Sequence, residues 1–445
     1  MTALQITLNL LSYACFSLGT LLVWPSRRNV IAWLGFPFFV VAYLIPLLAV
    51  DYASAATPEV IAELTAINAA GALAMAMGIV LGGHFGMKIS VKLPFRLAGP
   101  PASTGLSPRR AFKILIVGCV LMTLCFLWMR SVPAFADEPF LAKFFRGQYK
   151  ARYDQVSIPY RFSQIMLTAA LPLALVFLAE MRDRALLVPV VWAVVLFALA
   201  LNRGTALAGM VLMVAAWASR TRLRMTWFLL VSTFVFCVGS GVYFIIGLVV
   251  SADFNVWDEI ARGAPDVKDQ LGFLRAFDPS TQLTYGLTFI GGLVPSNFTY
   301  NPSVYTLTIA NDVADVSDVA SGGLRLPASI AGYMAFGWTG AILVSLVSGF
   351  LTGHFTKKLR VMPTRNFSQQ IATLLWFQIY ASFWILFYEM SYQGVISIFL
   401  FSYLIPDMAA LGRMKPATAR LLPRWRWCRR RATRAGVRAR QVGTP

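Results

Sequence analysis

The chain has 445 residues, of which 58% are hydrophobic and only 13% are charged, and its formal net charge is +20. Apolar runs of about 20 residues recur along it, and each is long enough to cross ~30 Å of hydrocarbon as a helix. This composition excludes a soluble globular protein and predicts an all-α, polytopic membrane protein.

Eleven transmembrane helices are predicted in the domain formed by residues 1–412. The first apolar run has neither a basic leading segment nor a small-residue cleavage site, so we expect it to be retained as a span. The predicted spans are centred on 4–24, 30–50, 64–86, 112–129, 161–179, 185–201, 205–219, 226–250, 328–350, 370–388 and 394–411.

Basic residues predict the direction of these spans, because Lys and Arg are retained on the cytoplasmic side. The clusters at 27–28, 88–113, 182–184, 220–224 and 357–365 all fall on one side if the N-terminus is external and the C-terminus cytoplasmic. The tail, residues 413–445, contains the stretch PRWRWCRRR. A basic arm of this kind can bind nucleic acid, but directly after a span it is expected to lie on anionic lipid headgroups.

Two external loops are long, at 130–160 and 251–327, the second ending before the ninth span. Long connections without regular structure are often functional. The late loop contains PSNFTYNPSVYTLT, in which Tyr300 and Tyr305 alternate with hydroxyl and amide side chains. Such a mixture suits sugars, which present apolar C–H faces and hydroxyl rims. The alternative is a structured loop with ordinary surface aromatics.

Three arginines, Arg161, Arg203 and Arg325, are predicted at the outward-facing N-termini of the fifth, seventh and ninth spans. A helix N-terminus already carries partial positive charge, so an arginine there is favourable when an anion is shared between them. The alternative is that these arginines reach lipid phosphates as interfacial anchors.

The stretch around Arg325 favours the anion site. Gly322 and Gly323 can adopt backbone angles that form an anion-binding nest, and Pro327 suits a helix start. The first external loop adds Arg146, Lys150 and Arg152. We therefore predict that these basic residues share one anionic ligand.

The segment GGLRLPASIAGYMAFGWTGAILVSLVSGFLTG resembles the one that follows the large external loop of bacterial oligosaccharide repeat-unit polymerases, the Wzy-type O-antigen polymerases. The matching Phe-Gly-x-x-Gly step is formed by Phe336, Gly337 and Gly340. NRGTALAGMVL resembles the Arg-containing short hairpin of that family, and FRGQYKARYD its basic external loop. The Arg-x15-Gly spacing of some members occurs at Arg275 and Gly291. One departure is Gly332, where an acidic residue is expected.

The resemblance implies glycosyl transfer on the external face of the bacterial inner membrane, without a metal or cofactor. A growing glycan would leave undecaprenyl pyrophosphate and join a hydroxyl of the next lipid-linked repeat unit. Arg203 and Arg325 would stabilise the charge of the leaving group. Expected partners are that lipid-linked substrate, membrane lipids and a chain-length regulator or other assembly proteins, with no nucleic acid.

The acceptor hydroxyl needs a general base. Both histidines, His84 and His354, are predicted at cytoplasmic span ends, so a carboxylate is required. The candidates are Asp154, Asp278 and Glu389. The alternative for Glu389 is an ordinary interfacial acid at a helix end.

Three other functions remain open. An O-antigen ligase would use the same donor, but that family shows an external histidine that this chain lacks. A transporter or flippase of lipid-linked saccharides should show broken helices and polar groups near the membrane midplane. The predicted spans carry few charges, which argues against transport. An accessory structural subunit is a further alternative.

Overall fold

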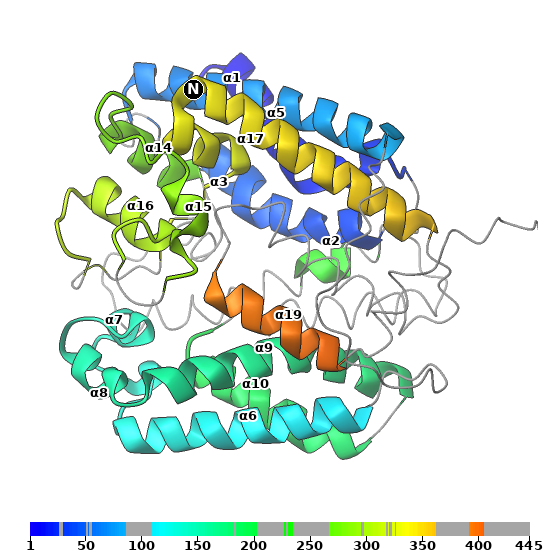
Figure 1. Ribbon diagram of the computed structural model, residues 1–445, viewed down its shortest axis with the longest axis vertical. Coiled ribbons are helices and arrows are strands. Elements are labelled where there is room, and N and C mark those ends of the chain that lie inside the picture. The colour runs from blue at the N-terminus through cyan, green and yellow to red at the C-terminus, as the bar shows by residue number, and fades with distance from the viewer. Residues whose placement is uncertain are drawn as a thin grey trace, which may run out of the picture.

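The computed structural model describes residues 1–25, 30–49, 52, 56–85, 108–181, 184–202, 227, 230–234, 267–294, 298–316, 319, 323–324, 326–361 and 391–404. Within these ranges the chain forms helices and no strand (Figure 1). The α-helices are α1 (Ala3–Leu18), α2 (Val30–Phe39), α3 (Ile45–Ala49), α5 (Pro58–Phe85), α6 (Pro108–Met129), α7 (Pro139–Phe144), α8 (Lys150–Asp154), α9 (Ser157–Met181), α10 (Leu187–Leu199), α14 (Val267–Ala276), α15 (Leu287–Gly291), α16 (Pro302–Asn311), α17 (Ala328–Val361) and α19 (Tyr392–Leu404).

The prediction of an all-α membrane protein is confirmed. Among the described residues, four helical stretches are long and apolar enough to cross a membrane: Ala3–Leu22, Pro58–Phe85, Arg109–Phe135 and Ala328–Lys357. Shorter apolar helices occupy Gly35–Leu48 and Leu187–Leu199. The predicted spans 205–219 and 370–388, most of 226–250 and the tail lie outside the described residues. The number of spans and their orientation therefore stay predictions.

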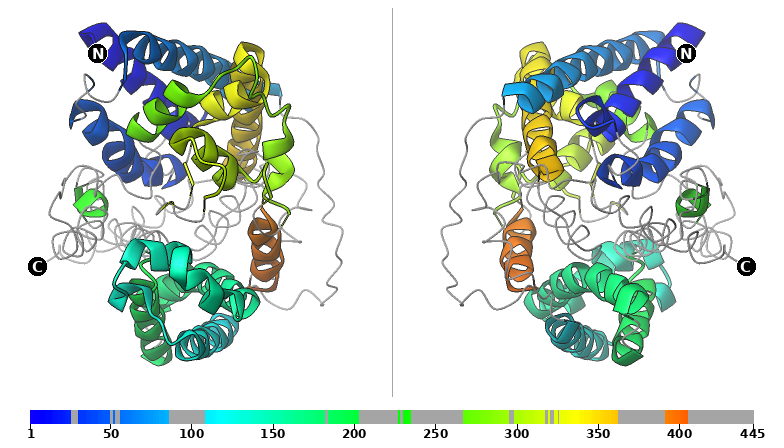
Figure 2. Two further views of the ribbon diagram at one scale, coloured as in Figure 1. Left: turned by 90° about the vertical axis from the view of Figure 1, so that its left-hand side faces the viewer. Right: turned by 90° about the vertical axis from the view of Figure 1, so that its right-hand side faces the viewer.

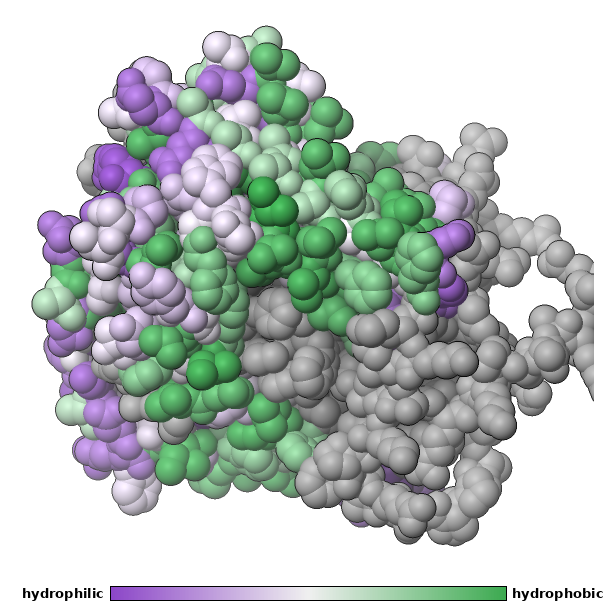
Figure 3. Space-filling model, turned by 45° about the horizontal axis from the view of Figure 1, so that its top comes forward, coloured by the Kyte–Doolittle hydropathy of each residue, from purple (hydrophilic) through white to green (hydrophobic). Residues whose placement is uncertain are grey.

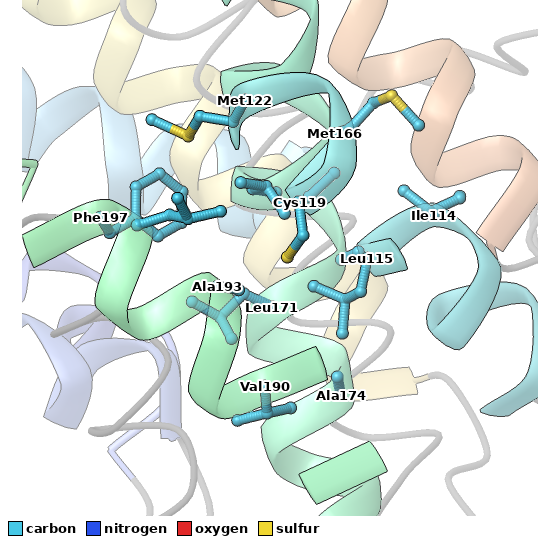
Figure 4. Packing of buried hydrophobic residues seen from close by; sticks show 14 of the residues in the cluster. Ile114, Leu115, Cys119, Met122, Met166, Leu171, Ala174, Val190, Ala193 and Phe197 are labelled. Carbon is cyan, nitrogen blue, oxygen red and sulfur yellow. The ribbon is translucent and has the colours of Figure 1, made fainter. Parts of the chain in front are cut away.

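The helices form two groups (Figure 1). One group consists of α6, α9 and α10, with α19 packed beside α9. Helices α6 and α9 are antiparallel, since Gly118 packs on Leu167 while Phe126 approaches Tyr160. Figure 4 shows the apolar core between the three helices, where Cys119 and Met122 of α6 lie near Phe197 of α10 and Met166 of α9.

The second group contains α1, α2, α3, α5, α14 and α17 around its own apolar core. Helix α5 packs closely on α17 because glycines remove side chains from the contact. A Cβ at Gly78 or Gly82 would lie 2.2 or 1.9 Å from a backbone oxygen of α17, and one at Gly349 or Gly353 would meet α5 in the same way. Such small-residue pairs are typical of membrane helices that pack backbone to backbone.

Helix α17, which covers the predicted ninth span, consists of two arms. Phe336 and Gly337 leave the helical conformation, and Gly337 has a φ of 63°. A Cβ at Gly332 would lie 2.2 Å from the carbonyl oxygen of Gly340, although eight residues span about 12 Å in a continuous helix. The arms 328–335 and 338–361 therefore fold back on each other as a hairpin.

The first arm begins inside the bundle. Ser329 on the first arm and Ser345 on the second both approach Gly71, which lies about 20 Å along α5 from its first residue. From there the first arm runs to the turn at 336–337. Just before this turn, the backbone N–H groups of Thr284 and Tyr285 donate to the carbonyls of Met334 and Ala335. These bonds satisfy carbonyl groups at the end of the first arm that have no partner within the helix. The same packing leaves no room for the acidic side chain expected at 332.

A buried polar network joins α1, α5, α14 and the first arm. Asn68 donates to the oxygens of Asn9 and Tyr13, both at 3.1 Å, and accepts a hydrogen bond from Ser329 at 3.0 Å. Tyr13 in turn donates to Gln270 of α14 at 2.8 Å. These polar groups lie in an apolar bundle, so their pairing fixes the position of the late loop on the membrane helices.

The loop helices α7, α8, α14, α15 and α16 gather at one end of both groups (Figure 1, left), which we call the loop end. Figure 2 (left) looks onto this end and shows α19 between the two groups. In Figure 3, hydrophobic residues cover the middle of one face and hydrophilic residues gather at the loop end. This band of apolar surface is expected of a protein that crosses a bilayer.

Candidate functional site

An arginine among aromatic rings lies at the loop end, in the first turns of α9. Arg161 is partly buried, and its Nε donates a hydrogen bond to the hydroxyl of Tyr153 on α8. The guanidinium also lies over the Tyr153 ring, 5.7 Å from the centroid. Tyr160 and Tyr392 interact with it electrostatically. We call Arg161, Tyr153, Tyr160 and Tyr392 the arginine–tyrosine cluster.

Ring contacts hold the cluster together. Phe145, which ends α7 in a left-handed conformation with φ 54°, stacks on Tyr153 at 3.9 Å between centroids. Tyr160 meets the edges of both rings, at 4.9 Å from Phe145 and 5.7 Å from Tyr153. Burial raises the pKa of Tyr153, and the charge of Arg161 opposes that rise. The Tyr153 hydroxyl therefore stays neutral and can donate or accept hydrogen bonds.

The charge of Arg161 is the chemically informative feature. Within the part of the chain that the structure describes, its partners are tyrosines and no carboxylate pairs with it. Removing a charge from water costs free energy unless a partner compensates it. A guanidinium in this position can bind a phosphate or carboxylate in bidentate fashion, and the neighbouring hydroxyls can add hydrogen bonds.

The late loop reaches the same end from the other helical group. The backbone N–H of Tyr392 donates to the carbonyl of Gly292, just after α15, at 3.0 Å. Arg146 of the first loop donates through Nη1 to the carbonyls of Val316 and Val319, the former at 2.6 Å. Burial lowers the pKa of Arg146, and nearby Asp315 opposes that change. Arg146 thus ties the two loops together.

The other predicted residues of the first loop are accessible. Lys150, Arg152 and Asp154 are exposed on α8, the helix that carries Tyr153. The structure therefore brings these three residues and Arg146 into the same loop as the arginine–tyrosine cluster.

The predicted residues of the late loop have mixed surroundings. Tyr305 is buried, its hydroxyl donates to the carbonyl of Gln282, and burial raises its pKa to about 12. Its ring stacks on that of Tyr300, which is partly exposed and remains available to a ligand. Arg275 is exposed at the end of α14.

Asp278 holds a turn after α14. Its carboxylate accepts hydrogen bonds from the backbone N–H and hydroxyl of Ser280 and from the hydroxyl of Thr281, at 2.8–2.9 Å. These bonds lower the pKa of Asp278, and the bond from the Ser280 N–H contributes most. A general base works best with a pKa near the operating pH, so this environment favours a structural role.

Gly323 has a φ of 126°, and a Cβ there would lie 2.6 Å from Ser303 at the start of α16. Glycine is therefore required at this position. The predicted residues Arg203, Gly322, Arg325 and Glu389 lie outside the described residues.

Two features were missed by sequence reasoning. Two of the tyrosines around Arg161, Tyr153 and Tyr160, come from the stretch YKARYDQVSIPYRF, and their closeness to the arginine in the sequence was a usable signal. The second is Glu63 of α5, whose carboxylate accepts a hydrogen bond from Tyr333 of the first α17 arm at 2.6 Å. An acid in a membrane helix is a candidate functional group.

Among the described residues, no group of three or more His, Cys, Asp or Glu side chains is placed to hold a metal ion. No protein-family model matches the sequence, and no curated protein or solved structure is detectably similar to it.

Proposed function

We propose that this chain polymerises oligosaccharide repeat units carried on undecaprenyl pyrophosphate, on the external face of the bacterial inner membrane. The observation that carries the proposal is the partly buried Arg161, whose partners at the loop end are tyrosines. A lipid diphosphate supplies the missing negative charge at the membrane boundary, where its polyprenyl chain must remain in the bilayer.

The reaction transfers a glycan between two lipid-linked molecules. An acceptor hydroxyl oxygen bonds to the anomeric carbon of the donor glycan, while the bond from that carbon to the pyrophosphate oxygen breaks. The pyrophosphate keeps the electron pair, and a base receives the hydroxyl proton. Because negative charge grows on the leaving group, a fixed guanidinium and tyrosine donors accelerate the step.

The proton acceptor is proposed to be a carboxylate at the loop end. Asp154 is exposed at the end of α8, one residue from Tyr153 of the arginine–tyrosine cluster. Asp278 is less suited because hydrogen bonds to its carboxylate lower its pKa. Glu389 remains a candidate on its sequence position alone.

Tyr300 supports the sugar-binding part of the proposal. Its partly exposed ring is held by Tyr305, whose own hydroxyl is used inside the loop. A ring fixed in this way can stack on the apolar face of a sugar without losing much conformational entropy.

The proposal is tested on the surface glycan of a strain that lacks this gene. Loss of long polymer with survival of single repeat units on the final acceptor supports the polymerase. Accumulation of lipid-linked polymer supports the ligase instead. Complementation with Arg161→Gln should fail to restore polymer, whereas Arg130→Gln, at an exposed position outside the cluster, should restore it.

A transporter of lipid-linked saccharides is the second candidate, and one observation favours it. The first arm of α17 begins inside the bundle beside buried Asn68 and Ser329. Discontinuous helices of this kind build substrate sites in many transporters. Unchanged polymer length with less polymer at the surface would favour transport.

A further inference from the structure

Helix α15 has the opposite polarity to a helix in water. Thr288 of α15 is fully buried and hydrogen-bonded at 3.1 Å to Thr284, which lies just before the helix and is also fully buried. Leu287 and Ile290 point outward instead, with 41% and 54% of their surfaces exposed. A water-facing helix buries its apolar side and exposes its polar side, so this arrangement indicates an apolar surrounding.

This arrangement, with polar side chains buried and apolar side chains exposed, is not found throughout the late loop. Helix α14 buries Val267, Leu271 and Phe273, and it exposes Arg275 and Ala276. This is the ordinary polarity of a loop helix in water. The unusual surface is thus confined to α15 and its flanks.

The apolar surface of α15 continues onto the turn of the α17 hairpin. Phe336 contacts Gly286, and its ring lies 6.3 Å from that of Phe289. Six exposed residues make up this surface, which we call the apolar patch: Tyr285, Leu287, Ile290, Val294, Phe336 and Trp338.

The patch also continues the outer face of the second α17 arm. Ile342, Leu343 and Val347 on that arm are between 43% and 53% exposed, as expected of a helix that faces lipid. The turn leads from this face directly to α15. Tyr and Trp in the patch are the aromatic residues enriched where membrane proteins meet the lipid headgroups.

We propose that the apolar patch lies in the bilayer, among the acyl chains of the leaflet at the loop end. Helix α15 then anchors the late loop at a fixed depth in the membrane. The anchor lies beside Thr284 and Tyr285, whose backbone N–H groups cap the first α17 arm. The inference concerns contact with bulk lipid and holds whichever reaction the protein performs.

The test uses single cysteines in full-length protein from which the five native cysteines have been removed. Ile290→Cys reports on the patch, Leu343→Cys on the lipid-facing arm and Ala276→Cys on the water-facing end of α14. Each is labelled with a bimane fluorophore in nanodiscs made with or without dibrominated phosphatidylcholine. The labels at 290 and 343 should lose most of their fluorescence to the brominated lipid, whereas the label at 276 should lose it only to aqueous iodide.

Two results would overturn the proposal. Quenching of the label at 290 by iodide and not by brominated lipid would place α15 in water. Protection from both quenchers would mean that protein, either a partner or a second copy of the chain, covers the patch.

If the cysteine-free protein does not fold, a benzophenone amino acid at 290 in the native chain answers the same question. Crosslinks to lipid support the proposal, and crosslinks to protein alone refute it.

Discussion

Replacing Gly332 by alanine distinguishes the hairpin in α17 from a continuous membrane helix. In a continuous helix the change is favourable, because alanine exceeds glycine in helix propensity by about 1 kcal/mol. In the hairpin, the new Cβ lies 2.2 Å from the carbonyl oxygen of Gly340 and 3.0 Å from the Cβ of Val344. An ordinary contact is about 3.5 Å or more, so the arms must separate by roughly 1 Å.

The expected cost follows from overpacking, which is typically ~1–3 kcal/mol. In domains of 150–250 residues a change of 1 kcal/mol shifts Tm by about 2–4 °C, so a fall of several degrees is expected. The assay is the folded fraction that survives heating in detergent at one fixed scan rate. The control is Gly272→Ala in α14, where a Cβ meets nothing within 4 Å. Gly332→Ala as stable as that control would refute the hairpin.

Three further predictions concern the cluster, the buried network and the turn after α14. Arg161→Gln should lower polymerisation by roughly 10²–10³-fold, measured on isolated membranes, because a charged donor to the leaving group is lost. Arg161→Lys keeps the charge but loses the planar guanidinium, so it should lose activity too; full activity in Arg161→Lys would contradict bidentate recognition, and full activity in Arg161→Gln would contradict the role of the charge. Asn68→Leu should destabilise the protein by about 1–3 kcal/mol for each partner left unpaired, whereas exposed Asn311→Leu should change little in the same thermal assay. The lowered pKa of Asp278 stabilises the fold above its ordinary value of 3.8, and this contribution is lost as the pH falls through the lower folded pKa. The Tm of Asp278→Asn should therefore fall less steeply between pH 5 and pH 3 than that of the wild type, and parallel curves would contradict the assignment.

Composition and apolar run length were sufficient to predict an all-helical membrane protein. They could not reveal the hairpin, because residues 328–350 have the same length and hydropathy whether the chain is straight or folded back. The signals that distinguish the two are the Phe336-Gly337 step and the paired glycines at 332 and 340. Their meaning depends on contacts between residues that are distant in a continuous helix.

Only part of the candidate site could be predicted, because its contacts also join residues that are distant in the sequence. The position of Arg161 at the start of a helix could be predicted from charge and hydropathy, but two of its tyrosine partners, Tyr153 and Tyr392, come from α8 and α19. Tyr305 stays a predicted glycan contact. Composition could not show that its hydroxyl donates to the carbonyl of Gln282 within the late loop.

The most direct test of the proposed function uses the purified, full-length protein in liposomes that contain repeat units linked to undecaprenyl pyrophosphate. We expect glycan chains of increasing length on the lipid, with release of one undecaprenyl pyrophosphate for each bond formed. Movement of unaltered lipid-linked units across the bilayer, without chain growth, would contradict the polymerase and establish transport in its place.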